Sequence, residues 1–164
     1  MLIGIDPGIT GAVAWMSDDG FLVEVADLPV AEVKVGRVTR RRLVPAVLAD
    51  MLASRRPVHS FLEEVATRPG EGAVGAFAFG RGAGQIEGVL AGMGIGYTLV
   101  RPQTWKRDLR LSSDKGAMRT RACQLWPGAA AQFKRVRDDG RAEAALIALY
   151  GSGRMQGVSP RRDA

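Results

Sequence analysis

The sequence has 164 residues, 46% of them hydrophobic, which suits one folded domain with a buried core. Its 23 Lys and Arg residues outnumber 17 Asp and Glu residues, and this net charge of +6 favours a polyanionic partner such as nucleic acid. Cys123 is the only cysteine, which excludes an intramolecular disulfide, and no Cys/His cluster offers a zinc site. No apolar run approaches the ~20 residues of a membrane span and no signal-peptide pattern opens the chain, so we expect a cytoplasmic, intracellular protein without membrane contact.

The opening of the chain predicts three antiparallel strands. Short apolar runs occupy residues 2–5, 11–16 and 21–26, and the turn-like segment Ser17-Asp18-Asp19-Gly20 separates the last two. A connection without clear periodicity follows at residues 30–42, and it is basic through Lys34, Arg37, Arg40, Arg41 and Arg42.

The middle of the chain predicts a helix, a strand, a loop and a second helix. Apolar residues with helical spacing indicate the first helix at residues 43–53, and residues 58–65 form a strand candidate that ends on two carboxylates. The glycine-rich composition of residues 69–84 predicts a loop, although apolar residues between positions 73 and 94 have helix-compatible spacing. A helix with small, close-packing residues follows it, over residues 82–94.

The last part predicts a fifth strand and two helices. The strand covers residues 97–100, and the first helix, 115–126, stops at Pro127-Gly128. The second helix runs over residues 139–150 and ends before Gly151. This order predicts one α/β domain at residues 1–151, with a five-stranded sheet that is antiparallel at one edge and parallel elsewhere. Residues 152–164 predict a basic, flexible tail.

Carboxylates occur at three places where they could converge. Asp6 ends the first strand, Glu63 ends the fourth, and Asp139 and Glu143 lie four residues apart on one helical face. Mg²⁺ takes oxygen ligands, and two-metal phosphodiester cleavage needs several carboxylates from different parts of a fold.

Each carboxylate also has a structural interpretation. Asp6 before Pro7-Gly8 suits a turn, Glu63 suits a solvated strand end, and Asp139 suits a helix cap. Taken singly these roles are commoner than metal ligation, and it is their joint occurrence that favours a metal site.

Three acidic segments resemble the motifs of RuvC-type Holliday junction resolvases, particularly the phage and chloroplast branch of that family. These are Ile3-Gly4-Ile5-Asp6-Pro7-Gly8, Leu62-Glu63-Glu64-Val65 and the segment from Asp138 to Ala144. Between them, residues 100–106, Lys115 and Leu125-Trp126-Pro127 are similar to the central part of that branch. The resemblance covers residues 1 to about 151 and implies an RNase H-like fold.

The resemblance also implies the site. Asp6, Glu63, Asp139 and Glu143 would bind two Mg²⁺ ions, for which Mn²⁺ could substitute, and Lys115 would lie close to the cleaved strand. Bacterial members space the last two acids three residues apart rather than four, and Asp138 is a rival for Asp139.

A second departure concerns the aromatic residue that intrudes at the junction in bacterial members. This chain has Ala66 at that place, so Phe77 or Phe79 would have to replace the aromatic as a wedge. Trp105 and Trp126 are expected to pack in or beside the core.

Basic residues around the acidic motifs predict contacts with DNA phosphates. Charge runs of this kind also occur on solvated faces that bind nothing. One run comprises Arg101, Lys106, Arg107, Arg110, Lys115, Arg119 and Arg121, and a second comprises Lys134, Arg135, Arg137 and Arg141. The candidates for DNA contact among them are Arg101, Lys106, Arg107, Lys115, Lys134, Arg135, Arg137 and Arg141.

The predicted function is Mg²⁺-dependent resolution of four-way or branched DNA by paired symmetric cuts that leave 5′-phosphate and 3′-hydroxyl ends. Two-fold symmetry of the junction predicts a homodimer, with the helix at residues 82–94 as the candidate seam. The alternatives are a related nuclease that acts on other branched DNA or on ribosomal RNA precursor, a non-catalytic junction-binding module, and an actin-like phosphotransferase, which needs two such domains.

Overall fold

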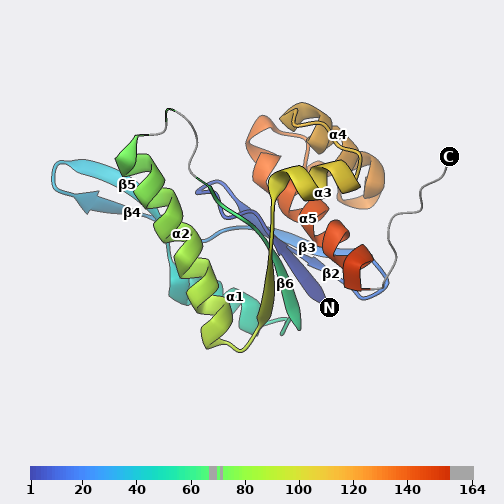
Figure 1. The fold of residues 1–164 in the computed structure, drawn as a ribbon, viewed down its shortest axis with the longest axis horizontal. Helices are drawn as coiled ribbons and strands as arrows, with labels where there is room; N and C mark the ends of the chain where they lie inside the picture. Colours follow the sequence, from blue (N-terminus) through green and yellow to red (C-terminus); the bar gives the residue numbers. More distant parts are fainter. Residues whose placement is uncertain (67–69, 71, 156–164) are drawn as a thin grey trace.

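The central element of the fold is a five-stranded sheet with the strand order β3-β2-β1-β6-β7 (Figure 1). The computed structural model describes residues 1–66, 70 and 72–155. Strands β1 to β3 pair antiparallel, whereas β6 and β7 run parallel to β1, which confirms the predicted mixed sheet. The five strands are β1 (Leu2–Ile5), β2 (Ala12–Met16), β3 (Leu22–Asp27), β6 (His59–Glu63) and β7 (Gly96–Val100).

Helices cover both faces of this sheet, and each face has its own apolar core (Figure 1). On one face, Ile3 and Ile5 of β1 pack with residues of α1 (Pro45–Ala53) and α2 (Ala73–Gly92). On the other, Leu2 packs with α5 (Asp139–Met155), because successive side chains of a strand point to opposite faces. The remaining helices are α3 (Pro102–Asp108), α4 (Lys115–Leu125) and the short 3₁₀ helices η1 (Pro127–Gln132) and η2 (Val136–Asp138).

Helix α5 packs unusually close to β1. A Cβ at Gly4 would overlap the carbonyl oxygen of Ala144 and the backbone nitrogen of Ala148, so only glycine permits this approach. Since α5 also contacts β2, the helix is fixed against the two strands that lead into and out of the Asp6 loop.

The basic connection at residues 30–42 proves to be an ordered hairpin. Strands β4 (Val30–Val35) and β5 (Val38–Leu43) form a separate two-stranded sheet beside α2 (Figure 1). Gly36 has a φ of 61° at the first of the two turn residues, as in type II′ hairpin turns. The apolar alternation of Val33, Val35 and Val38 was the missed signal.

Two predicted helix boundaries were wrong. Helix α2 begins at Ala73 rather than near residue 82, since Ala, Val and Phe between the glycines continue a helical apolar stripe. Helix α5 continues through Gly151 to Met155, because this glycine packs where a Cβ would overlap the Phe61 ring and is not a helix stop. Residues 69 and 71 of the predicted loop and residues 156–164 of the predicted tail lie outside the described residues. Within the described part of the chain, no helix combines the length and apolarity needed to cross a membrane.

Candidate metal centre

Parallel pairing brings Asp6 and Glu63 side by side. Ile5 of β1 pairs with Leu62 of β6, so the residues that follow them, Asp6 and Glu63, lie at the same edge of the sheet. Ile5 and Leu62 both point toward the core beside α1 and α2. Asp6 and Glu63 therefore follow on the opposite face, the one that α5 covers.

Helix α5 carries the other two acids to the same edge. Gly140, between them in sequence, lies so close to the loop after β1 that a Cβ would overlap the Thr10 carbonyl oxygen and come within 3.0 Å of the Asp6 Oδ2 atom. Glycine at this position is what lets the first turn of α5 lie against Asp6. The structure thus places the start of α5 next to Asp6 at this edge of the sheet.

The carboxylates are close enough to influence one another. Burial, followed by the negative charges of Glu143 and Glu63, raises the pKa of Asp6 from 3.8 to about 7. A hydrogen bond from the Gly8 amide to Asp6 Oδ1, 3.2 Å long, and the positive charge of Lys115 act in the opposite direction. Asp6 therefore lies in a strongly negative, poorly hydrated place, which favours a bound cation.

Basic side chains from α3 and α4 surround the acids. The Lys106 Nζ atom lies 3.5 Å from Glu143 Oε1, and the Lys115 Nζ atom lies 3.8 Å from Asp139 Oδ2. Arg119 donates a hydrogen bond to the other oxygen of Asp139. Arg119 belongs to the first predicted basic run, although it was not among the residues singled out as DNA contacts.

Trp105 forms a hydrogen bond with Glu63, although the sequence predicted it only as a packing residue. Its ring is fully buried, as predicted, but its Nε1–H also donates a 3.0 Å hydrogen bond to Glu63 Oε1. Lys106 lies over the same ring, 5.0 Å from its centroid. Helix α3, which the sequence did not predict, therefore positions both Glu63 and Lys106 at the site.

The geometry separates the roles of Asp138 and Asp139. Asp138 is buried and forms a capping box with Arg135, whose side chain lies 2.8 Å from Asp138 Oδ1. Burial acts to raise the pKa of Asp138, but hydrogen bonds from the Arg135 side chain and backbone outweigh it and lower the pKa. Asp138 therefore stabilises the turn that leads into α5, whereas Asp139 faces Lys115 and Arg119.

The other predicted DNA contacts divide into two groups. Four of these residues are engaged in ion pairs, namely Arg101 with Glu64, Arg107 with Asp108, Arg135 with Asp138 and Arg141 with Asp27. Lys134 and Arg137 lie exposed on the chain just before α5. The arginine pairs with Asp138 and Asp27 fix the start of α5, so Arg135 and Arg141 have a structural role that charge counting did not indicate.

The four carboxylates are chemically suited to a hard divalent cation, although their side chains are not arranged as a metal-binding cluster. Across residues 1–66, 70 and 72–155, no group of three or more Asp, Glu, His or Cys side chains is arranged to hold an ion. Asp6, Glu63, Asp139 and Glu143 nonetheless offer only carboxylate oxygens, the ligands that Mg²⁺ prefers. Lys106, Lys115 and Arg119 occupy positions at which they would compete with such an ion for Asp139 and Glu143.

Comparison with known proteins gives matches in both sequence and fold. The chain is 34% identical over 167 aligned residues to the chloroplastic Holliday junction resolvase MOC1 of Chlamydomonas reinhardtii, an alignment that takes in 85% of the chain. The aligned part is 19% of that relative, so the chain spans about a fifth of its length. No protein-family model matches the chain.

Solved structures of RuvC have the same fold. RuvC of T. thermophilus in complex with a Holliday junction substrate superposes with a TM-score of 0.69 at 19% identity, covering 96% of this chain and 97% of that one. A second Thermus thermophilus RuvC structure gives a TM-score of 0.58 at 20% identity over the same shares. The predicted resemblance is therefore confirmed: this chain has the RuvC fold and is similar in sequence to a chloroplastic Holliday junction resolvase.

Proposed function

We propose that the protein is a divalent-metal-dependent endonuclease that cuts Holliday junctions or closely related branched DNA. The observation that carries the proposal is the convergence of Asp6, Glu63, Asp139 and Glu143, from two strands and one helix, on one edge of a RuvC fold. The sequence relationship to a chloroplastic Holliday junction resolvase supports the choice of substrate.

We assign Asp6, Glu63, Asp139 and Glu143 as ligands of two Mg²⁺ ions. When bound, such ions activate the attacking water and stabilise the leaving 3′ oxygen of the phosphodiester. Trp105 orients Glu63 through its indole N–H. Lys115 has a largely exposed side chain and lies near Asp139. We expect it to contact the phosphates of the cleaved strand when Asp139 serves as a metal ligand.

We further propose that the protein acts as a homodimer. A four-way junction has two-fold symmetry, so two copies on one axis would present one site to each of two strands. Gly84, Gly88 and Gly92 follow one another at helical spacing in the C-terminal half of α2, and a Cβ at any of them would meet only open space. This face is the proposed seam, and sedimentation of Gly88→Glu beside the unchanged protein tests it.

One cleavage experiment tests the central proposal. A labelled four-way junction, a linear duplex and a structured RNA are each incubated with the protein in Mg²⁺ or in EDTA, beside Asp6→Asn and the control Asp50→Asn, an exposed carboxylate on α1. We expect paired cuts in the junction alone, lost in EDTA and in Asp6→Asn but retained in Asp50→Asn. Equal cutting of duplex, or undiminished cutting by Asp6→Asn, would overturn the proposal.

A further inference from the structure

Both carboxylate oxygens of Asp139 face cations from helix α4. Arg119 donates a hydrogen bond to Asp139 Oδ1, and the Lys115 Nζ atom lies 3.8 Å from Asp139 Oδ2. Lys115 and Arg119 are four residues apart, so they lie on the same face of α4. If Asp139 is to bind a metal ion through Oδ1, Arg119 must therefore move away from that oxygen.

The two cations differ in how firmly they are held. The Lys115 side chain is 61% exposed, whereas the side chains of Arg119 and Asp139 are only 18% and 20% exposed. A pair of charges that is mostly shielded from water is screened little by salt. A guanidinium also stays protonated, so Arg119 cannot leave by losing its charge. Arg119 is thus the stronger competitor for Asp139.

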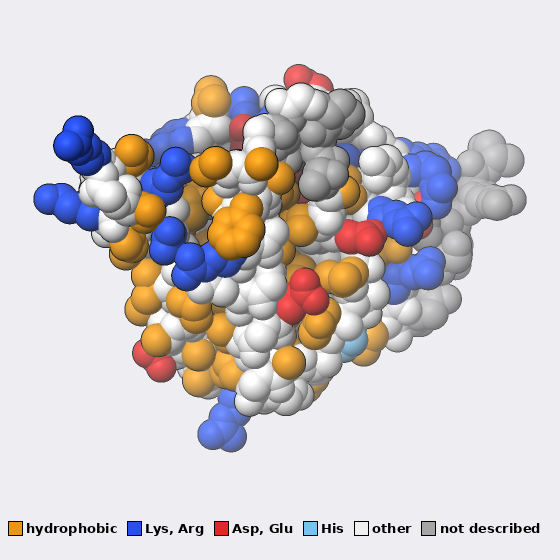
Figure 2. Space-filling view, turned by 60° about the vertical axis from the view of Figure 1, so that its left-hand side comes forward, with side chains coloured by type: hydrophobic (Ala, Val, Ile, Leu, Met, Phe, Trp, Pro, Cys, Tyr) orange, Lys and Arg blue, Asp and Glu red, His pale blue; other side chains and the backbone are white. Residues whose placement is uncertain are grey.

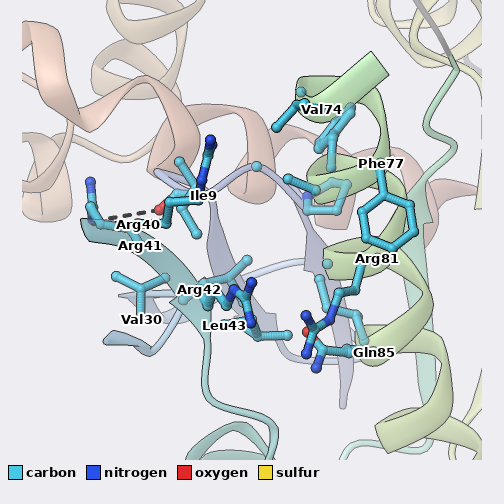
Figure 3. A pocket seen from close by; sticks show the side chains of 18 of the residues that line it. Ile9, Val30, Arg40, Arg41, Arg42, Leu43, Val74, Phe77, Arg81 and Gln85 are labelled. Atoms are coloured by element: carbon cyan, nitrogen blue, oxygen red, sulfur yellow. Dashed lines mark hydrogen bonds between the residues drawn. The ribbon is translucent and has the colours of Figure 1, made fainter. Parts of the chain in front are cut away.

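Arginines beside α2 are not held in this way. A groove of about 650 Å³ between the β4–β5 hairpin and α2 is lined by four of them, Arg40, Arg41, Arg42 and Arg81 (Figure 3). Among the described residues, none of the four forms an ion pair with a carboxylate. Figure 2, which turns this side of the molecule forward, shows Lys and Arg side chains at the surface. The inward position of Arg119 is therefore a feature of the acidic site and not a general result of excess positive charge.

We propose that Arg119 is an internal counter-ion, which holds Asp139 in the metal-free protein and moves to a phosphate of bound DNA when Asp139 becomes a metal ligand. The inference rests on the proposed function and deepens it, because it makes the binding of metal and the binding of DNA depend on each other. A guanidinium suits both partners, since its parallel N–H groups match two oxygens of a carboxylate or of a phosphate.

The dependence is reciprocal. Without DNA, Asp139 can serve as a metal ligand only if the charge of Arg119 is left without a partner in a poorly hydrated place, which is costly. Bound DNA offers Arg119 a phosphate and so removes that cost. Conversely, Arg119 is free to bind the phosphate only when Asp139 no longer holds it. Metal and DNA should therefore each strengthen the binding of the other by the same factor.

The first measurement is Mg²⁺ binding to the DNA-free protein by calorimetry. The variants are Arg119→Gln, Arg119→Lys and the matched control Arg121→Gln, which removes the same charge from the same helix. Arg121 is exposed and forms no ion pair with a carboxylate of the described residues. We expect Arg119→Gln to bind Mg²⁺ roughly fivefold to a hundredfold more tightly than the unchanged protein. The control, and Arg119→Lys, which keeps the charge, should change the affinity by less than about threefold.

The second measurement is DNA binding by anisotropy at several salt concentrations, in EDTA and in saturating Mg²⁺. The ligand is a fluorescently labelled nicked duplex, which as the product of the proposed reaction is not cut further. In EDTA, Arg119→Gln should show the salt dependence of the unchanged protein, because Asp139 holds Arg119 there. In Mg²⁺ the same variant should lower the slope of log affinity against log salt by roughly one, for one lost phosphate contact. Arg121→Gln should show no such difference between EDTA and Mg²⁺.

The outcomes distinguish this inference from the proposed function. If Arg119→Gln binds Mg²⁺ as the unchanged protein does, or more weakly while still folded in thermal unfolding, the counter-ion role is overturned even if the protein resolves junctions. An equal loss of slope in EDTA and in Mg²⁺ also overturns it, since Arg119 would then contact DNA whether or not metal is bound. Tighter Mg²⁺ binding by Arg119→Gln in a protein that cuts no junction would support the counter-ion role and refute the nuclease.

Discussion

Replacing Asp6 by Asn should stabilise the metal-free protein at pH 8. The pKa of Asp6 is raised from 3.8 to about 7, so between these values the folded protein binds a proton more tightly than the unfolded chain does. The folded state therefore loses stability as the pH rises from about 4 to 7. The difference between a pKa of 3.8 and one of about 7 corresponds to about 4 kcal/mol of lost stability above pH 7.

Asn resembles the protonated acid in shape and can keep the hydrogen bond from the Gly8 amide. We expect Asp6→Asn to match the unchanged protein at pH 4 and to exceed its stability by about 2 to 4 kcal/mol at pH 8, or roughly 5 to 15 °C in melting temperature for a domain of this size. The assay is thermal unfolding in EDTA across this pH range, with the exposed Asp50→Asn as control. A gain that did not change with pH, or an equal gain in the control, would refute the electrostatic account.

Three other predictions concern the metal and two glycines. Adding Mg²⁺ should raise the melting temperature of the unchanged protein at pH 8 but not that of Asp6→Asn, and an equal rise in both would argue against Asp6 as a ligand. Trp105→Phe should weaken Mg²⁺ binding roughly tenfold to a hundredfold in calorimetry, because Glu63 loses the hydrogen bond from the indole N–H. Unchanged affinity in a folded variant would show that this hydrogen bond does not position Glu63. Gly4→Ala should destabilise the fold by several kcal/mol in urea titrations, since the added Cβ meets rigid α5 backbone, whereas Gly128→Ala, with open space around it, should change stability by less than about 1 kcal/mol.

The sequence predicted the parts of the molecule that depend on local pattern. Short apolar runs and a turn signal located the strands, and the end of a strand located Asp6 and Glu63 correctly at one edge of the sheet. The four-residue spacing of Asp139 and Glu143 placed both on one helix. These predictions held because alternation and helical periodicity follow directly from backbone geometry.

What the sequence did not predict depends on contacts between distant segments. Glycine has the same composition signal in a loop and in a helix, so composition misplaced the start of α2, whose glycines have open space around them. The role of Gly151, in contrast, was decided by its packing against the Phe61 ring. The hydrogen bond from Trp105 to Glu63 joins residues 42 positions apart. The partner of Arg141, Asp27, likewise became evident only once β3 was placed beside α5.

The four acids of the proposed metal site come from distant parts of the described chain. Asp6 lies near the start of the chain, whereas Asp139 and Glu143 lie on α5, the last described helix, which must dock on β1 before the acids can meet. A chain emerging from the ribosome thus carries Asp6 and Glu63 long before it carries their partners. The proposed metal site is therefore complete only after α5 has been synthesised and packed against β1.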